Sequence, residues 1–175
     1  MSAWEERLLL GIHGLAHPVL DGLARVSHEL GTMAFCAVLV VVMTALHLWR
    51  AERRAACVWL AVGSASAALQ SGLKALVARP RPQLWEHVIT HASWAFPSGH
   101  ALASAALYPL LARFLVQVDP VRRRMWWAAG IGLPVFVGLG RLYLGVHWPS
   151  DVLAGWALGA ALAFGAHRWL ARHGV

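Results

Sequence analysis

The chain has 175 residues, of which 59% are hydrophobic and only 13% are charged. Ordinary soluble domains have roughly 45–50% apolar and about 25% charged residues, so this composition excludes the usual soluble class and favours one integral membrane domain. The formal net charge is +7, but the basic residues lie in short clusters between apolar runs. That arrangement is typical of membrane topology, and it argues against nucleic acid as a partner.

Residues 1–30 differ from the rest of the chain. Their leucine and isoleucine residues are mixed with His13, His17 and Asp21, and Pro18 interrupts the apolar pattern. We expect one or two helices that lie at the membrane interface, although a tilted sixth span would also fit. No basic region precedes a long apolar core at the start, so the sequence gives no sign of a cleavable signal peptide.

Five apolar segments follow, each close to the roughly 20 residues that a helix needs to cross a bilayer. They cover residues 31–49, 56–77, 101–118, 125–139 and 152–170. The fourth segment is short unless it continues into the next few residues, up to and beyond Arg141. We therefore predict an all-α fold, a polytopic transmembrane helical bundle of five to six spans. Residues 31–175 would form this domain, and residues 1–30 would form interfacial or membrane-associated helices.

The loops between these segments alternate in charge. Short arginine-rich stretches occupy residues 50–54, 119–124 and 167–173. By the positive-inside rule these stretches lie in the cytoplasm, together with the C-terminus, and loops 78–97 and 140–151 lie on the outer face. Arg79 and Arg81 in the first outer loop oppose this assignment, unless a binding site holds them.

Three cations are predicted to lie at neighbouring outer helix ends: Lys74, Arg81 and Arg141. A charge at such a depth is costly and marks Lys74 as a functional candidate by default, with snorkelling to the headgroups as the weaker alternative. Together the three cations predict a site for an anion with several oxygen atoms.

The stretch FPSGH places Pro97, Ser98, Gly99 and His100 where an apolar helix begins. Ser98 is a suitable N-cap, and the free amide groups of a helix N-terminus suit phosphate. Gly99 would let the backbone approach a ligand closely, and His100 would project from the first turn. Many ordinary helix starts have this composition, so the stretch carries weight only in combination.

His147 and Asp151 are four residues apart, which one helical turn could bring together. The carboxylate would then accept from one ring nitrogen and leave the other free to attack. Pro149 is tolerated in the first turn of a helix. If the pair stood alone, a helix cap beside a surface histidine would be the better explanation.

In combination these residues predict phosphoryl transfer through a phosphohistidine. One imidazole attacks phosphorus, a second protonates the leaving oxygen, and cations and amide groups hold the phosphoryl oxygens. Lysine and arginine supply the positive charge, so we expect no metal and no other cofactor.

Three motifs resemble the type 2 phosphatidic acid phosphatase family of membrane lipid phosphatases. They are KALVARPRP, which contains Lys74, Arg81 and Pro82; PSGH, which begins at Pro97; and GRLYLGVHWPSD, which contains Arg141, His147 and Asp151. Their spacings and order match over about 80 residues of the chain. One departure is Gly140, where the family often has a serine; that serine would be a minor phosphate contact, so we expect activity to survive.

This resemblance implies a role for each residue. His147 would be the nucleophile, Asp151 its partner and His100 the general acid. The phosphate would be bound by Lys74, Arg81, Ser98, Gly99 and Arg141. It also implies a helical fold with the site at the outer face, in agreement with the charges of the loops. The family's soluble acid phosphatases and vanadium haloperoxidases do not fit the apolar spans.

A site level with the headgroups suits a phosphate whose tail stays in the bilayer. The resemblance favours undecaprenyl diphosphate as the substrate, in a bacterial cytoplasmic membrane with the active site facing the periplasm or the outside. Phosphatidylglycerophosphate, phosphatidate and lipid A phosphatases are the alternatives. The motifs recognise only the phosphate, so the lipid, its entry path and the oligomeric state stay open.

Two other classes remain possible from the sequence. His87, His91 and His100 could bind zinc in a metal hydrolase, but this would not explain Lys74 and the arginines. A transporter of anionic lipids would be compatible with the spans and the cations, but it would not need a nucleophile and a carboxylate.

Overall fold

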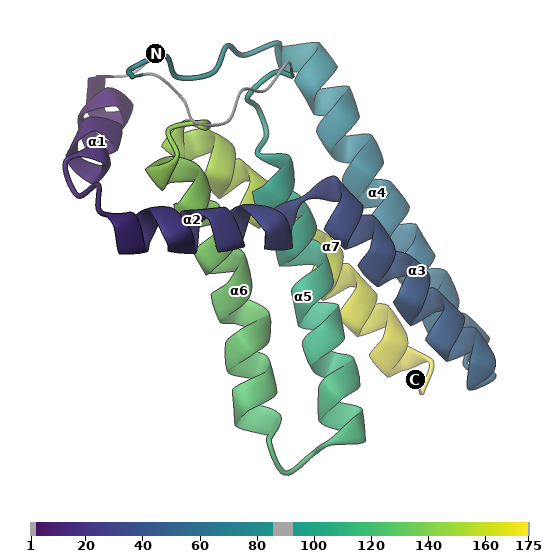
Figure 1. Cartoon of the computed structure of the whole chain (residues 1–175). Helices are drawn as coiled ribbons and strands as arrows, with labels where there is room; N and C mark the ends of the chain where they lie inside the picture. Colours follow the sequence, from purple (N-terminus) through teal and green to yellow (C-terminus); the bar gives the residue numbers. More distant parts are fainter. Residues whose placement is uncertain (1–2, 86–92, 175) are drawn as a thin grey trace.

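The computed structural model describes residues 3–85 and 93–174, and within these residues it has seven helices and no strand. In chain order the helices are α1 (Ala3–His13), α2 (Pro18–Gly31), α3 (Met33–Trp49), α4 (Arg53–Val77), α5 (Gly99–Val118), α6 (Arg123–Tyr143) and α7 (Pro149–Arg172) (Figure 1). The predicted all-α membrane fold is therefore confirmed.

Helices α3 to α7 run up and down beside one another and form the bundle (Figure 1). The arginine-rich connections α3–α4 and α5–α6 lie at one end of this bundle, with the C-terminus. The connections α4–α5 and α6–α7, which carry the three motifs, lie at the other end. The alternation of loop charge thus corresponds to the two ends of one helical body.

By length and composition, α4, α5 and α6 can each cross a membrane, and α2 with α3 can form a fourth, bent span. This count, which covers the described residues, is below the predicted five to six spans. The difference includes α7, which is 24 residues long but rich in alanine, glycine and tryptophan. Glycine and tryptophan lower its mean hydropathy, as do the polar residues at its two ends, and the glycines pack closely on a neighbouring helix.

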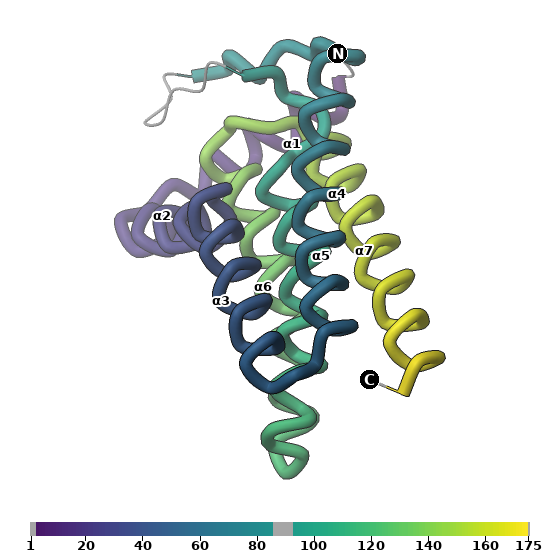
Figure 2. The backbone as a smooth tube through the Cα atoms, turned by 90° about the vertical axis from the view of Figure 1, so that its right-hand side faces the viewer, coloured from purple at the N-terminus to yellow at the C-terminus, as the bar shows by residue number. Residues whose placement is uncertain are grey.

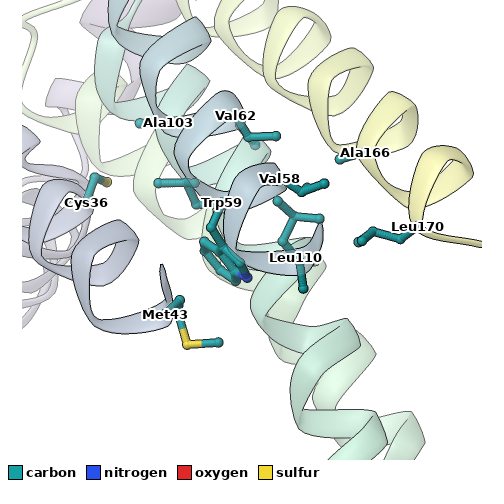
Figure 3. Close-up of a cluster of buried hydrophobic side chains, with 12 residues drawn as sticks. Cys36, Met43, Val58, Trp59, Val62, Ala103, Leu110, Ala166 and Leu170 are labelled. Atoms are coloured by element: carbon teal, nitrogen blue, oxygen red, sulfur yellow. The ribbon is translucent and has the colours of Figure 1, made fainter. Parts of the chain in front are cut away.

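Helix α5 is the centre of the bundle, since eleven of its 20 residues are buried. Gly155 and Gly159 of α7 face it so closely that side chains there would meet its backbone. On another side, Trp59 of α4 and Met43 of α3 join α5 and α7 residues in one hydrophobic cluster (Figure 3). The outward surfaces of these helices are also apolar, with exposed side chains such as Val38, Val41, Leu60, Ile131, Val135, Leu139, Leu153 and Phe164. Such a surface suits lipid rather than water.

Helix α2 crosses the bundle instead of following it, and it lies on the side opposite α7 (Figure 2). It meets α3 at an angle of 48°. Thr32 makes the bend: its backbone is extended, and its hydroxyl accepts from the Phe35 amide to start α3. A hydroxyl that satisfies a free amide in this way stabilises the start of a helix. As a result α2 packs on α5 and α6 near the motif end.

We expect Gly155→Ala to weaken the bundle. A Cβ at this position would lie 2.7 Å from the Ser98 carbonyl oxygen and 3.1 Å from the Leu102 nitrogen, and neither backbone atom can move aside cheaply. Overpacking of this kind costs about 1–3 kcal/mol. The matched control is Gly165→Ala in the same helix, where the added methyl group meets open space. Thermal unfolding in detergent should show a lower midpoint for the first variant only; equal midpoints would contradict the packing argument.

Candidate active site

Asp151 joins the three motif segments at one end of the bundle. The residue is fully buried in the first turn of α7. Its Oδ1 accepts from Arg79 Nη1 at 2.6 Å, and its Oδ2 accepts from the Trp148 amide at 2.8 Å. Its main-chain oxygen accepts from the Ser98 amide at 3.0 Å, which ties the start of α5 to the start of α7. The PSGH segment and the third motif are therefore neighbours.

His147 lies in the loop between α6 and α7, and its side chain is buried. Its Nε2 is 3.2 Å from Arg81 Nη1. Because a guanidinium group only donates, Nε2 must be the acceptor, and the proton of the neutral ring is assigned to Nδ1. Nδ1 is 3.6 Å from Asp151 Oδ2, slightly beyond hydrogen-bond range, and within the described residues it has no hydrogen-bond partner. Geometry alone thus selects the tautomer that leaves Nε2 with its lone pair.

Burial is the main reason why the pKa of His147 falls from 6.5 to about 4. The neighbouring carboxylate of Asp151 raises this pKa, but the positive charges of Arg81 and Arg141 oppose it. The imidazole is therefore neutral near pH 7. The same contributions show that both arginines are close enough to act on this ring.

Arg81 is held by several acceptors in the α4–α5 and α6–α7 loops. Its Nε donates to the Ser93 carbonyl at 2.8 Å, and its Nη1 donates to the Val146 carbonyl at 2.7 Å. The Ser93 hydroxyl is 3.1 Å from Arg81 Nη2 and also 3.1 Å from Lys74 Nζ. Burial lowers the pKa of Arg81, and the charge of Asp151 raises it. Ser93 thus brings two of the three predicted cations together.

Arg141, the third predicted cation, is fully buried at the end of α6. Its Nη1 is 2.9 Å from His28 Nδ1. Within the described residues, its Nε and Nη2 have no hydrogen-bond partner. Unpaired donors on a buried cation are costly, so they indicate where an anion could bind.

The PSGH segment differs in detail from its prediction. Ser98 is the N-cap of α5, but its side chain makes no capping bond, so the predicted capping contact is wrong. The hydroxyl is buried, and among the described residues it has no partner. Gly99 lies against Gln70 of α4, and a Cβ at Gly99 would collide with Gln70 Oε1. His100, which is half-buried, points its Nε2 to His28 Nδ1 at 3.2 Å.

Three residues of the site were not singled out from the motifs: Glu5, His28 and Arg79. Glu5 of α1 is buried and accepts from Ser150 Oγ at 2.6 Å and from Arg79 Nη2 at 2.8 Å. Arg79 therefore bridges Glu5 and Asp151. The positive charge of Arg79 in a loop predicted to lie on the outer face opposed the positive-inside rule, and this conflict was a usable signal for a binding site. Glu5 and His28 lie in the N-terminal helices, where no spacing pointed to them.

Gly140, the departure from the family pattern, has its own explanation in α2. A Cβ at this position would coincide with the hydroxyl of Ser27, and the Ser27 Cβ would be 2.8 Å away. Ser27 is buried and donates to the Ala24 carbonyl at 2.7 Å. A hydroxyl from another helix thus occupies the space beside Arg141 that a serine side chain would need.

The zinc alternative depends on His87 and His91, which lie outside the described residues. In the part of the chain that the structure describes, no group of three histidine, cysteine or acidic side chains is placed to bind a metal ion.

We expect Arg79→Ala to destabilise the protein by about 3–5 kcal/mol, because it leaves Glu5 and Asp151 as buried carboxylates without their shared cation. The matched control is Arg122→Ala, which removes an exposed ion pair with Asp119 and should cost about 0–1 kcal/mol. Denaturant or thermal unfolding in detergent measures both. Similar losses for the two variants would show that the buried network does not hold the site.

Comparison with known proteins places the chain in a family. The model of the PAP2 superfamily matches residues 54–174. Phosphatidylglycerophosphatase B from Bacillus subtilis (strain 168) is 34% identical over 140 residues, which are 78% of this chain and 68% of that protein. Undecaprenyl-diphosphatase from Sulfolobus acidocaldarius is 41% identical over 71 residues, which are 41% of this chain but only 31% of that protein.

A solved structure agrees with these sequences. The crystal structure of a transmembrane PAP2 type phosphatidylglycerolphosphate phosphatase from Bacillus subtilis superposes with a TM-score of 0.87 at 29% identity. The match covers 97% of this chain and 86% of that one, so it includes the N-terminal helices that the family model leaves out. On the family match, the identity and the shared fold, the chain belongs to the PAP2 superfamily of membrane phosphatases.

Proposed function

We propose that this PAP2 phosphatase hydrolyses a lipid phosphate or diphosphate through a phosphohistidine at His147. One observation carries the proposal. A buried, neutral imidazole places the lone pair of Nε2 beside the partly buried guanidinium group of Arg81, the buried Arg141 lies nearby, and a carboxylate faces its other nitrogen. A nucleophile, an orienting base and an anion site are thus in one place.

In the first step, the lone pair of His147 Nε2 attacks phosphorus, and the bond from phosphorus to the leaving oxygen breaks. His100 gives a proton to that oxygen, so the lipid part leaves as a neutral hydroxyl or a protonated phosphate. The imidazole becomes cationic as the N–P bond forms, and Asp151 stabilises the proton on Nδ1. Arg81, Arg141 and Lys74 neutralise the phosphoryl oxygens, with the hydroxyl of Ser98 and the first amide groups of α5.

In the second step, water attacks the phosphohistidine and gives a proton to His100, which is neutral after the first step. The N–P bond breaks, its electron pair returns to Nε2, and inorganic phosphate is released. The second step thus restores the protonation states with which the first step began. Lysine and arginine provide the positive charge throughout, so a metal ion has no step to perform.

The site lies at one end of a bundle with an apolar outer surface, which suits a phosphate at headgroup depth with its tail in the bilayer. Undecaprenyl diphosphate is our first substrate, on the side of a bacterial cytoplasmic membrane that faces the periplasm or the outside. Phosphatidylglycerophosphate is the second, and it is favoured by the Bacillus relatives, which align with most of this chain.

We expect His147→Ala to lower phosphate release on the order of 10³-fold or more, because the covalent step is lost. Phosphate release from undecaprenyl diphosphate, phosphatidylglycerophosphate and phosphatidate in detergent measures this and ranks the substrates. Vanadate should inhibit the wild type, and EDTA should not. Rates of His147→Ala close to the wild type would contradict the mechanism. Lipid binding without hydrolysis by the wild type would favour the transporter alternative.

The pH profile provides a separate check on His147. The ring is the nucleophile only when it is neutral, and its pKa is lowered to about 4. Activity should therefore persist as the pH falls through 6.5 and decline only near pH 4. The measurement is kcat/KM against pH, corrected for the ionisation of the substrate phosphate. A loss of activity as the pH falls through the ordinary histidine value of 6.5 would show that the buried, cation-flanked ring is not the attacking group.

A further inference from the structure

His28 connects two residues that the mechanism uses, although it lies outside all three motifs. It is in the last turn of α2, the helix that crosses the bundle. Its Nδ1 is 2.9 Å from Arg141 Nη1 and 3.2 Å from His100 Nε2. The planes of the two imidazole rings differ by only 20°, and their centroids are 5.1 Å apart. The two rings therefore form an offset stack in which these two nitrogen atoms approach each other.

The contact with Arg141 determines the protonation of His28. A guanidinium group carries only donors, so His28 Nδ1 is the acceptor in this contact and the proton of the neutral ring is assigned to Nε2. The nitrogen of His100 that faces the lone pair of His28 Nδ1 must then carry a proton, because two lone pairs at 3.2 Å would repel. His100 enters the first step with a proton on each ring nitrogen, and the proton on Nε2 is thus held by a residue outside the three motifs.

We propose that His28 is a positioning residue for both His100 and Arg141, which rests on the function proposed above. Its single acceptor keeps a proton on His100 Nε2 before the substrate arrives. It also holds Arg141 Nη1, which leaves the unpaired Nε and Nη2 of Arg141 for the phosphoryl oxygens. The contact with Arg141 is the shorter one, so His28 stays with the arginine when His100 passes its proton to the leaving oxygen.

The backbone of α2 does not depend on the His28 side chain for its place. The hydroxyl of Tyr108 donates to the Leu30 carbonyl at 2.6 Å and so fixes α2 to α5. Gly31 packs so closely that a Cβ there would lie 2.7 Å from both His100 Cδ2 and Val137 Cγ1. A substitution at His28 therefore tests the acceptor and leaves the docking of the helix in place.

The test compares His28→Ala and His28→Asn on two kinds of substrate. The side chain of asparagine can place an acceptor oxygen about where His28 Nδ1 lies, whereas alanine has no acceptor. Short-chain phosphatidate leaves as an alkoxide that needs a proton, whereas p-nitrophenyl phosphate leaves as a phenolate that does not. We expect His28→Ala to lose about tenfold or more in kcat on phosphatidate but about threefold or less on the aryl ester, since general acid catalysis matters only for the poor leaving group.

The expected result for His28→Asn is recovery of most of the wild-type kcat on phosphatidate. Equal losses on both substrates, no loss, or an asparagine variant as slow as the alanine variant would each overturn the proposal. If His28→Ala is not recovered folded, His28→Leu fills the space without an acceptor and takes its place. A wild type that releases no phosphate, or a His147→Ala variant that still does, would instead refute the proposed function, and the role of His28 with it.

Discussion

The site depends on one buried carboxylate whose oxygens must all be satisfied. A carboxylate that leaves water loses a large hydration energy, which only close hydrogen bonds and an opposite charge can replace. Asp151 obtains them from Arg79, from the Trp148 amide and, through its main-chain oxygen, from the Ser98 amide. These partners belong to the α4–α5 loop, the α6–α7 loop and the start of α5. Satisfying this group therefore brings together segments that are 72 residues apart in the chain.

The cations of the site are less well satisfied than its acids. Arg79 has two carboxylates, those of Glu5 and Asp151, but Arg141 has two unpaired nitrogen atoms among the described residues. Arg81 donates to carbonyl groups and to His147 rather than to a carboxylate. A phosphate supplies the negative oxygens that these groups lack. In the proposed mechanism, a phosphoryl oxygen that accepts the hydrogen bond from Arg81 Nη1 would also release the lone pair of His147, so substrate binding would expose the nucleophile.

The sequence predicted those parts of the site that depend on the ends of long apolar helices. Spacing within the motifs placed Lys74, Arg81, His100, Arg141 and His147 at neighbouring helix ends, and loop charge placed these ends together. Some local predictions failed because neighbouring side chains decide them. The Ser98 hydroxyl makes no capping bond, and the space at Gly99 is limited by Gln70 of another helix. The span count differed because α7 uses small residues for packing where lipid contact alone would favour larger apolar ones.

The N-terminal helices show why the remainder of the site is hard to predict. Glu5 and His28 contact the motif residues because α2 turns at Thr32 and crosses the bundle. A single threonine before an apolar run is not enough to predict the 48° bend between α2 and α3. The motifs contain the groups proposed to bind phosphate, and the positions of these groups can be predicted from their spacing in the sequence. The groups that fix their charge and tautomer come from helices far away in the chain. Protonation in this site is therefore a property of the tertiary fold, whereas the identity of the reacting atoms is a property of the motifs.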